Sequence, residues 1–317
     1  MGLLNLSPRV GTAGLVGLVA LNVVVVAMAL RSTHTIGTDT SPVGSKSTSS
    51  VGATGTPSSP SPASPATATA TATRAPAAPL LTQLVAIDNQ RAWRVSVGSC
   101  TAGGAALATT TDGGKTWVDA KAPLRTIVRV RPNDGRSAFV VGAGSGCAAE
   151  LMSTTDGGDS WGSTSIVGSA WFRDPKNPRA VGSPGSSTSR PCGVSAVLDL
   201  AVLSADAARV LCADGRVRST TSAGSSWADS GEVTGAVALS VSSADPAQTY
   251  VARVGVPDCP GIQIQRVDQS VATSCIHTVV PTDPGQIALS LVKGGGWLAI
   301  GHSTMRSTDE LVSWSAS

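Results

Sequence analysis

Acidic, aromatic and metal-binding side chains are scarce in this sequence. Its 317 residues include one tyrosine, Tyr250, and three glutamates, Glu150, Glu232 and Glu310. The histidines are isolated, and no two of the six cysteines have the C-x-x-C spacing of zinc or redox motifs. Without a cluster of ligand-type side chains, we expect neither a metal ion nor a cofactor.

Excess charge of one sign is also missing from most of the chain. Four of the 23 basic residues and one of the 20 acidic residues precede position 80, so residues 80–317 carry 19 of each. A neutral segment with scattered charges lacks the basic surface that nucleic-acid binding requires. Gly, Ala, Val, Ser and Thr dominate, a mixture that favours short strands and tight turns. Abundant Ala, Gly, Val and Arg with little Lys is typical of a GC-rich bacterial genome.

The first 31 residues contain an apolar run that predicts a membrane anchor. Residues 10–30 are interrupted only by Thr12 and Asn22, and they match the roughly 20 residues that cross a bilayer as a helix. Arg9 and Arg31 flank the run, so charge orients it weakly. An Ala-Met-Ala pattern that ends at Ala29 offers the alternative of a cleaved signal peptide and a secreted protein. Because the run is longer than a usual signal core, we predict an uncleaved single-pass anchor.

Residues 32–79 are a low-complexity stretch of Ser, Thr, Pro and Ala. They include alternating Ala and Thr at residues 66–73 and too few large apolar residues to offset the entropy of ordering. We predict a disordered linker that holds the folded domain, residues 80–317, away from the membrane. All six cysteines lie in that domain. An even number of cysteines beyond an export signal favours disulfides in an oxidising compartment, so the C-terminal domain is expected outside the cell membrane.

A repeat around tryptophan sets the predicted architecture. Two octapeptides, TTDGGKTW at residues 110–117 and TTDGGDSW at residues 154–161, lie 44 residues apart. Two weaker copies follow: residues 220–227 lack the Asp, and residues 307–314 lack the Gly. An Asp that accepts hydrogen bonds from its own turn, a Gly with positive φ and a Trp at the start of a strand describe a hairpin with a hydrophobic anchor. The predicted structural residues of these turns are Asp112, Gly114, Trp117, Asp156, Gly158, Trp161, Trp227, Asp309 and Trp314.

With these motifs the sequence resembles the Asp-box (BNR) repeat proteins, which include sialidases and the propellers of photosystem II assembly factors. The resemblance implies an all-β propeller in which each Asp box lies between the third and fourth strands of a blade. We predict about six four-stranded blades, with five or seven as alternatives, over residues 84–120, 127–164, 199–229, 237–276 and 287–316. The remaining blade begins at residue 169, ends before Val197 and is degenerate. Single blades bury too little apolar surface to be stable alone, so closure into a ring stabilises them.

The blade register implied by this resemblance also suggests how the cysteines pair. Six cysteines allow 15 pairings. Cys100 and Cys147 both follow a second strand in adjacent blades, and the expected positions of Cys259 and Cys275 reach one common face. The hypothesis is therefore three disulfides: Cys100–Cys147, Cys259–Cys275 and, from the two that remain, Cys192–Cys212.

The candidate site is the axial channel of the propeller. The candidates for its lining are charged residues on or near the presumed inner strands: Asp88, Arg129, Arg131, Arg173 and Asp199. The interpretation that the pattern favours is that they are solvated residues at strand ends. The resemblance to sialidases implies an arginine triad, a Tyr/Glu pair and an Asp acid/base. The sequence has no Arg-Ile-Pro motif before the first Asp box, and no Glu accompanies Tyr250 in a recognisable pattern.

The functional hypothesis is therefore a monomeric binding or scaffold module on the outer side of a membrane. Its expected partner is a protein or a glycan, since a propeller presents loops on two faces and a central channel. The alternative is a divergent sialidase-like glycoside hydrolase.

Overall fold

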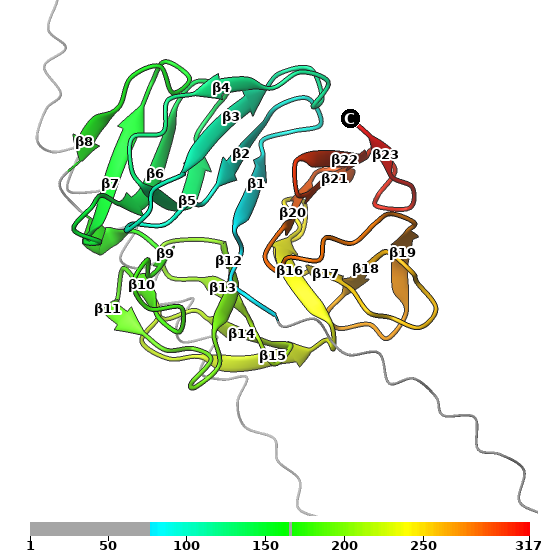
Figure 1. Cartoon of the computed structure of the whole chain (residues 1–317). Helices are drawn as coiled ribbons and strands as arrows, with labels where there is room; N and C mark the ends of the chain where they lie inside the picture. Colours follow the sequence, from blue (N-terminus) through cyan, green and yellow to red (C-terminus); the bar gives the residue numbers. More distant parts are fainter. Residues whose placement is uncertain (1–76, 165–166) are drawn as a thin grey trace, which may run out of the picture. The chain divides into compact units, whose positions relative to one another are not determined.

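The computed structural model describes residues 77–164 and 167–317. These residues form six antiparallel sheets arranged around a centre, with no α-helix among them (Figure 1). The predicted all-β propeller of six blades is confirmed. Among these residues no helix has the length and apolar character needed to cross a bilayer. The predicted anchor at residues 10–30 and nearly all of the predicted linker at 32–79 lie outside the described residues.

Five blades are meanders of four consecutive strands. Blades 1 and 2 consist of β1 (Thr82–Ala86), β2 (Ala92–Ser96), β3 (Ala106–Thr110), β4 (Val118–Ala120), β5 (Thr126–Pro132), β6 (Ala138–Ala143), β7 (Ala149–Thr154) and β8 (Gly162–Thr164). Blades 4 and 5 consist of β12 (Val197–Val202), β13 (Ala208–Cys212), β14 (Arg216–Thr220), β15 (Ala228–Glu232), β16 (Ala236–Val241), β17 (Thr249–Arg253), β18 (Ile262–Arg266) and β19 (Ala272–Ile276). Blade 6 consists of β20 (Ile287–Val292), β21 (Gly295–Ile300), β22 (Ser303–Ser307) and β23 (Ser315–Ala316).

Burial follows the position of a strand in its blade. All six residues of the innermost strand β20 are buried, because neighbouring blades cover both of its faces. All five residues of the outermost strand β15 are exposed. Continuous apolar runs therefore mark inner strands, and polar runs mark outer strands.

The ring closes through side-by-side contacts and without strand exchange. The innermost strand of each blade contacts that of the next, and β20 contacts β1. At this seam the Trp297 indole N–H donates to the Asp88 carbonyl (2.9 Å), and Arg94 donates to the His302 carbonyl (2.7 Å). Packing and hydrogen bonds between blades 6 and 1 thus close the ring.

Blade 3 is built differently from the other five, in keeping with the degenerate blade that the sequence predicted there. It has three strands, β9 (Phe172–Arg173), β10 (Val181–Ser183) and β11 (Ser186–Ser189), preceded by the 3-10 turn η1 (Val167–Ser169). Its inner strand runs opposite to β12. The Trp171 indole, just before β9, donates to the Ser204 carbonyl beyond the end of β12, whereas Arg173 donates to the Leu198 carbonyl near the start of β12. Each strand of a meander carries the chain from one face of the ring to the other. Because β9 begins on the face opposite to the start of β12, blade 3 needs an odd number of strands to return the chain to that start.

The two faces of the ring differ. On one, named here the turn face, the hairpins after each third strand meet the hairpins after each first strand. In four blades the backbone of the outer hairpin donates to the inner one, as Gly113 does to Gln90 and Gly157 to Arg136. The other, named the disulfide face, carries the cystines Cys100–Cys147, Cys192–Cys212 and Cys259–Cys275. These are the three pairs suggested by the blade register.

Candidate functional site

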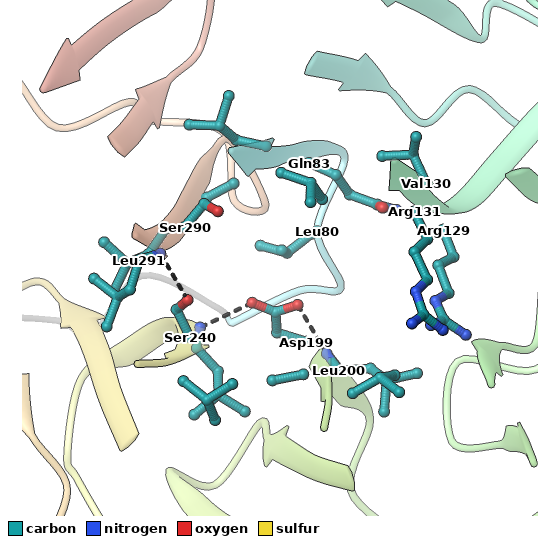
Figure 2. Close-up of a pocket in the computed structure, with 18 of the residues that line it drawn as sticks. Leu80, Gln83, Arg129, Val130, Arg131, Asp199, Leu200, Ser240, Ser290 and Leu291 are labelled. Carbon is teal, nitrogen blue, oxygen red and sulfur yellow. Dashed lines mark hydrogen bonds between the residues drawn. The ribbon is translucent and has the colours of Figure 1, made fainter. Parts of the chain in front are cut away.

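An axial cavity of about 300 Å³ lies where the six innermost strands converge. Apolar side chains from β1, β12, β16 and β20 form much of its wall, and its polar groups come from a few positions (Figure 2). The charged or polar residues that line it are Gln83, Arg129, Arg131, Arg173, Asp199, Ser204, Ser240 and Ser290. Four of the five charged residues that the sequence suggested for the channel are therefore in its wall.

Asp199 is the one carboxylate in the lining of this cavity. Its two oxygens accept the backbone N–H groups of Leu200 and Leu239, each at 2.8 Å (Figure 2). Burial raises the pKa of Asp199, while these two hydrogen bonds and the nearby Arg173 oppose that shift. Because Leu239 belongs to β16, the carboxylate ties blade 4 to blade 5.

Arg173 closes one end of the cavity together with the first described residues of the chain. Its guanidinium, 7% exposed, donates to the carbonyls of Leu198 (3.2 Å) and Leu80 (3.0 Å). Burial lowers its pKa, and Asp199 acts in the opposite direction. The Leu80 N–H donates to Leu198 in blade 4, and Thr82 begins blade 1 on the opposite side of the ring. Residues 79–82, named here the strap, therefore cross the axis at the disulfide face.

Arg129 and Arg131 lie towards the other end of β5 and extend side by side (Figure 2). Arg129 donates to the Trp171 carbonyl (2.6 Å), and both guanidiniums lie over the ring of Phe139, at 5.3 and 5.9 Å from its centroid. Burial and the charge of Arg131 lower the pKa of Arg129 to about 9, so it remains a cation at neutral pH. Arg131 is exposed, and its guanidinium has no hydrogen bond or ion pair with any described residue.

Asp88 lies away from the cavity. One of its oxygens accepts the N–H groups of Gln90 and Arg91, and the other pairs with the Arg91 guanidinium at 2.6 Å. The carboxylate therefore caps the turn between β1 and β2. The sequence IDNQR contains this signal, because an Asp that precedes a turn bonds its own backbone two or three residues on.

The repeated Asp motif forms the same hydrogen-bonded turn in blades 1, 2 and 6. In blade 1, Asp112 accepts the N–H (3.0 Å) and hydroxyl (2.6 Å) of Thr116 and the hydroxyl of Thr110 (2.8 Å). The Thr110 oxygen in turn accepts the N–H of Gly114 (3.0 Å), whose φ is +87°. These bonds, chiefly those from Thr116, lower the pKa of Asp112 to about 2. The carboxylate is thus fully engaged inside its own turn.

The other copies repeat this geometry with different residues. Asp156 and Asp309 bond Ser160 and Ser313, and their pKa values are lowered for the same reason. In blade 4, Ser222 replaces the Asp, and its hydroxyl oxygen accepts the N–H of Ser226 (3.1 Å). The turn conformation therefore survives the loss of the carboxylate.

The motif tryptophans pack against the preceding blade. Trp161 meets Trp93 edge to face with centroids 6.4 Å apart, and Trp117 meets Trp297 at 6.4 Å. In blades 3 and 4, Trp171 meets Trp227 at 5.9 Å. Trp314 in blade 6 donates to the Ser274 hydroxyl of blade 5 (3.1 Å). The tryptophans thus join neighbouring blades and do not line the axial cavity.

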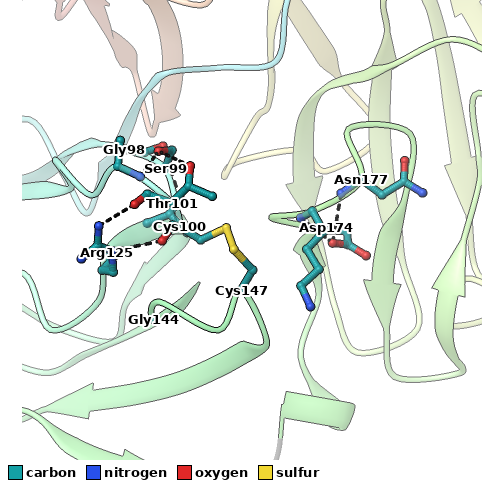
Figure 3. Close-up of a disulfide and its surroundings, with 12 residues drawn as sticks. Gly98, Ser99, Cys100, Thr101, Arg125, Gly144, Cys147, Asp174 and Asn177 are labelled. Atoms are coloured by element: carbon teal, nitrogen blue, oxygen red, sulfur yellow. Dashed lines mark hydrogen bonds between the residues drawn. A yellow bond between two sulfur atoms is a disulfide. The ribbon is translucent and has the colours of Figure 1, made fainter.

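The described residues contain no group of three His, Cys, Asp or Glu side chains placed to hold a metal ion. All six cysteines are in disulfides. The bond between Cys100 and Cys147 joins the loops of blades 1 and 2 and lies near the Asp174–Asn177 turn of blade 3 (Figure 3).

No protein-family model and no curated protein matches the sequence. Solved structures are similar at low identity. YCF48 bound to a D1 peptide is 17% identical, with 76% of this chain and 82% of that one covered and a TM-score of 0.30. A GH74 xyloglucanase from Xanthomonas campestris is 16% identical, with coverages of 74% and 38% and a TM-score of 0.29. The Aleuria aurantia lectin is 11% identical, with coverages of 76% and 96% and a TM-score of 0.44. Values this low assign neither a family nor a function.

Proposed function

We propose that the chain is a non-catalytic recognition propeller that binds an anionic segment of a protein or glycan at the turn-face end of its axial cavity. Residues 10–30 anchor it in a membrane, residues 32–79 act as a spacer, and the propeller works as a monomer on the outer side; secretion after cleavage near Ala29 is the alternative. The turns of blades 1, 2 and 6 fit the Asp-box family, where they serve as structural elements.

The cavity supports this proposal because its two ends differ. The strap crosses the disulfide-face end, so a ligand enters from the turn face. There it meets the exposed guanidinium of Arg131, which has no hydrogen-bond or ion-pair partner among the described residues. Arginine forms forked, charge-assisted hydrogen bonds with carboxylate, sulfate or phosphate groups. This uncompensated cation at the open end of the cavity carries the proposal.

The glycoside hydrolase alternative finds less support in the cavity. Hydrolysis of a glycosidic bond ordinarily uses two carboxylates around the sugar. Asp199 is the one carboxylate in the lining, and backbone N–H groups already engage both of its oxygens. Tyr250, the one tyrosine, donates its hydroxyl to Gln248 and does not lie near Arg129 in the ring.

A panel of immobilised acidic peptides and acidic oligosaccharides, probed with the purified full chain, tests the proposal. We expect binding that Arg131→Gln weakens at least about tenfold, the loss expected for a charged hydrogen bond. Arg179→Gln is the matched control, since Arg179 is an exposed arginine in a loop of the disulfide face. Equal binding by both variants would contradict the proposal. Turnover of a fluorogenic sialoside, lost on changing Arg129 or Tyr250, would establish the hydrolase instead.

A further inference from the structure

Four second strands carry an aromatic residue at the same register position, and one of these residues is Tyr250 on β17. In the ladder between the second and third strands, Trp93 on β2, Phe139 on β6 and Trp297 on β21 each follow the first paired residue of the second strand. Trp93 faces blade 2 and Trp297 faces blade 1, because each meets the motif tryptophan of that following blade. By the same register, Phe139 faces blade 3.

The following blade leaves Phe139 without the tryptophan partner that Trp93 and Trp297 have. Blade 3 has three strands and therefore no hairpin between a third and a fourth strand, the hairpin that carries Trp117 and Trp161 in blades 1 and 2. Trp171 of blade 3 packs instead on Trp227 of blade 4. Within residues 77–164 and 167–317, no tryptophan ring stacks on Phe139.

An open groove of about 690 Å³ borders Phe139 on this side. It is lined by Phe139, Leu151 and short polar side chains, which are Asn133, Ser137, Ser153, Thr154, Thr155, Ser163 and Ser169. The guanidiniums of Arg129 and Arg131 lie over the Phe139 ring at the axial side of the groove. The wall of the groove thus combines a half-buried aromatic ring with hydroxyl groups, and two guanidiniums lie over that ring.

We propose that this groove, named here the socket, binds a tryptophan side chain that a partner protein presents on an acidic turn. The chain itself shows the fit, because indole rings fill the equivalent positions against Trp93 and Trp297. Aromatic pairs of this kind contribute about 0.5–1.5 kcal/mol beyond the area they bury. The charge of Arg131 selects a carboxylate beside that tryptophan, as Asp159 lies beside Trp161 in the motif. Arg131 lines the axial cavity, and its guanidinium lies over the Phe139 ring of the socket. Phe139 and Ser163 line the socket alone.

A hairpin peptide copied from the chain's own motif tests the socket. The probe is a labelled, end-cyclised peptide of residues 149–164, titrated against the full chain by fluorescence anisotropy, with its Trp161→Ala form as the reference. We expect Phe139→Ala to weaken binding at least tenfold. Ser163→Trp fills the groove from an exposed position on β8 and should abolish binding without unfolding the protein, whereas Ala228→Trp on the exposed outer strand of blade 4 should leave it unchanged.

The outcomes separate the socket from the axial cavity. Equal affinity for the peptide with and without its tryptophan contradicts the proposal, and so does binding that survives both Phe139→Ala and Ser163→Trp. Binding that resists those two changes but is lost in Arg131→Gln assigns the ligand to the axial cavity, which upholds the proposed function and overturns the socket. A neutral oligosaccharide that occupies the groove while the peptide does not also overturns it.

Discussion

The interface between blades 1 and 2 differs sharply from the interface between blades 2 and 3. The first has an edge-to-face tryptophan pair, Trp93 with Trp161, and the Cys100–Cys147 disulfide. At the second, the described contacts include the Arg129 hydrogen bond to Trp171 and contacts of η1 with β7. The interface that receives the motif hairpin of blade 2 is therefore sealed, and the interface before blade 3, which has no motif hairpin, contains an open groove.

This difference arises from the direction of one short strand. Because β9 runs opposite to the other inner strands, blade 3 needs an odd number of strands. It has three, and therefore no motif hairpin between a third and a fourth strand. The ring remains closed, because β9 still contacts both β5 and β12. A propeller can thus gain a recognition groove by losing a hairpin, without changing its number of blades.

Removal of the indole at the sealed interface should have the largest effect on stability. Trp93 is 1% exposed, so Trp93→Ala should lower the free energy of unfolding by about 4 kcal/mol, the cost of deleting a large buried aromatic side chain. Phe139→Ala at the open interface should cost about 1 kcal/mol, because its ring is only half-buried. Urea unfolding of the two variants measures the difference. Equal losses would mean that the two interfaces are packed alike.

The disulfide of the sealed interface should come next. Replacing Cys100 and Cys147 together by Ala should lower the free energy of unfolding by up to about 4 kcal/mol, since the bond closes a loop with a sequence separation of 47 residues. Urea unfolding under oxidising conditions measures this loss. A smaller loss from removing the Cys259–Cys275 pair, whose separation is 16, is the matched comparison. The reverse order would contradict the entropic explanation.

The smallest effect should come from exchanging the turn residues of blades 2 and 4. The pKa of Asp156 is lowered in the folded protein, so its carboxylate stabilises the fold above the unfolded pKa of about 3.8. This contribution is lost as the pH falls below 4 and the folded carboxylate becomes protonated.

Asp156→Ser should therefore make unfolding less sensitive to pH between 4 and 2, and Ser222→Asp should make it more sensitive. Acid titration followed by tryptophan fluorescence compares the two variants with the parent. A Ser222→Asp variant with the pH dependence of the parent would show that the hydroxyl and the carboxylate are equivalent in these turns.

The sequence predicted the elements that repeat and missed those that depend on chain direction. The Trp-to-Trp spacing placed the turns around Asp112 and Asp156, and the loss of Asp at Ser222 left enough of the pattern to place blade 4. The pattern of apolar and polar residues in SAWFRD is compatible with a strand that runs in either direction. The reversed direction of β9 therefore could not be predicted from the local sequence. Phe139 was missed, although its Ala-Phe pair aligns with Ala-Trp at Trp93, because only the lost hairpin makes it distinctive.

The candidate site was partly predictable for a related reason. Arg129, Arg131, Arg173 and Asp199 belong to inner strands whose apolar neighbours identify them, so their positions in the wall of the cavity follow from the pattern. The strap was not predictable, since Leu80 interacts with Leu198 and Arg173, residues more than 90 positions away in the chain. Asp88 was assigned to the channel because it lies at the end of an inner strand. In the structure its carboxylate instead accepts hydrogen bonds from the turn that follows that strand.

Hydrogen exchange of the full chain, alone and with the hairpin peptide, tests most directly whether one interface is open for recognition. In the free protein, amides of β2 and β3 at the sealed interface should exchange slowly, and those of β7 and η1 at the open interface should exchange faster. The peptide should slow exchange in β7 and η1 and leave the disulfide face unchanged. Equal protection of the two interfaces in the free protein, with no response to the peptide, would contradict this account.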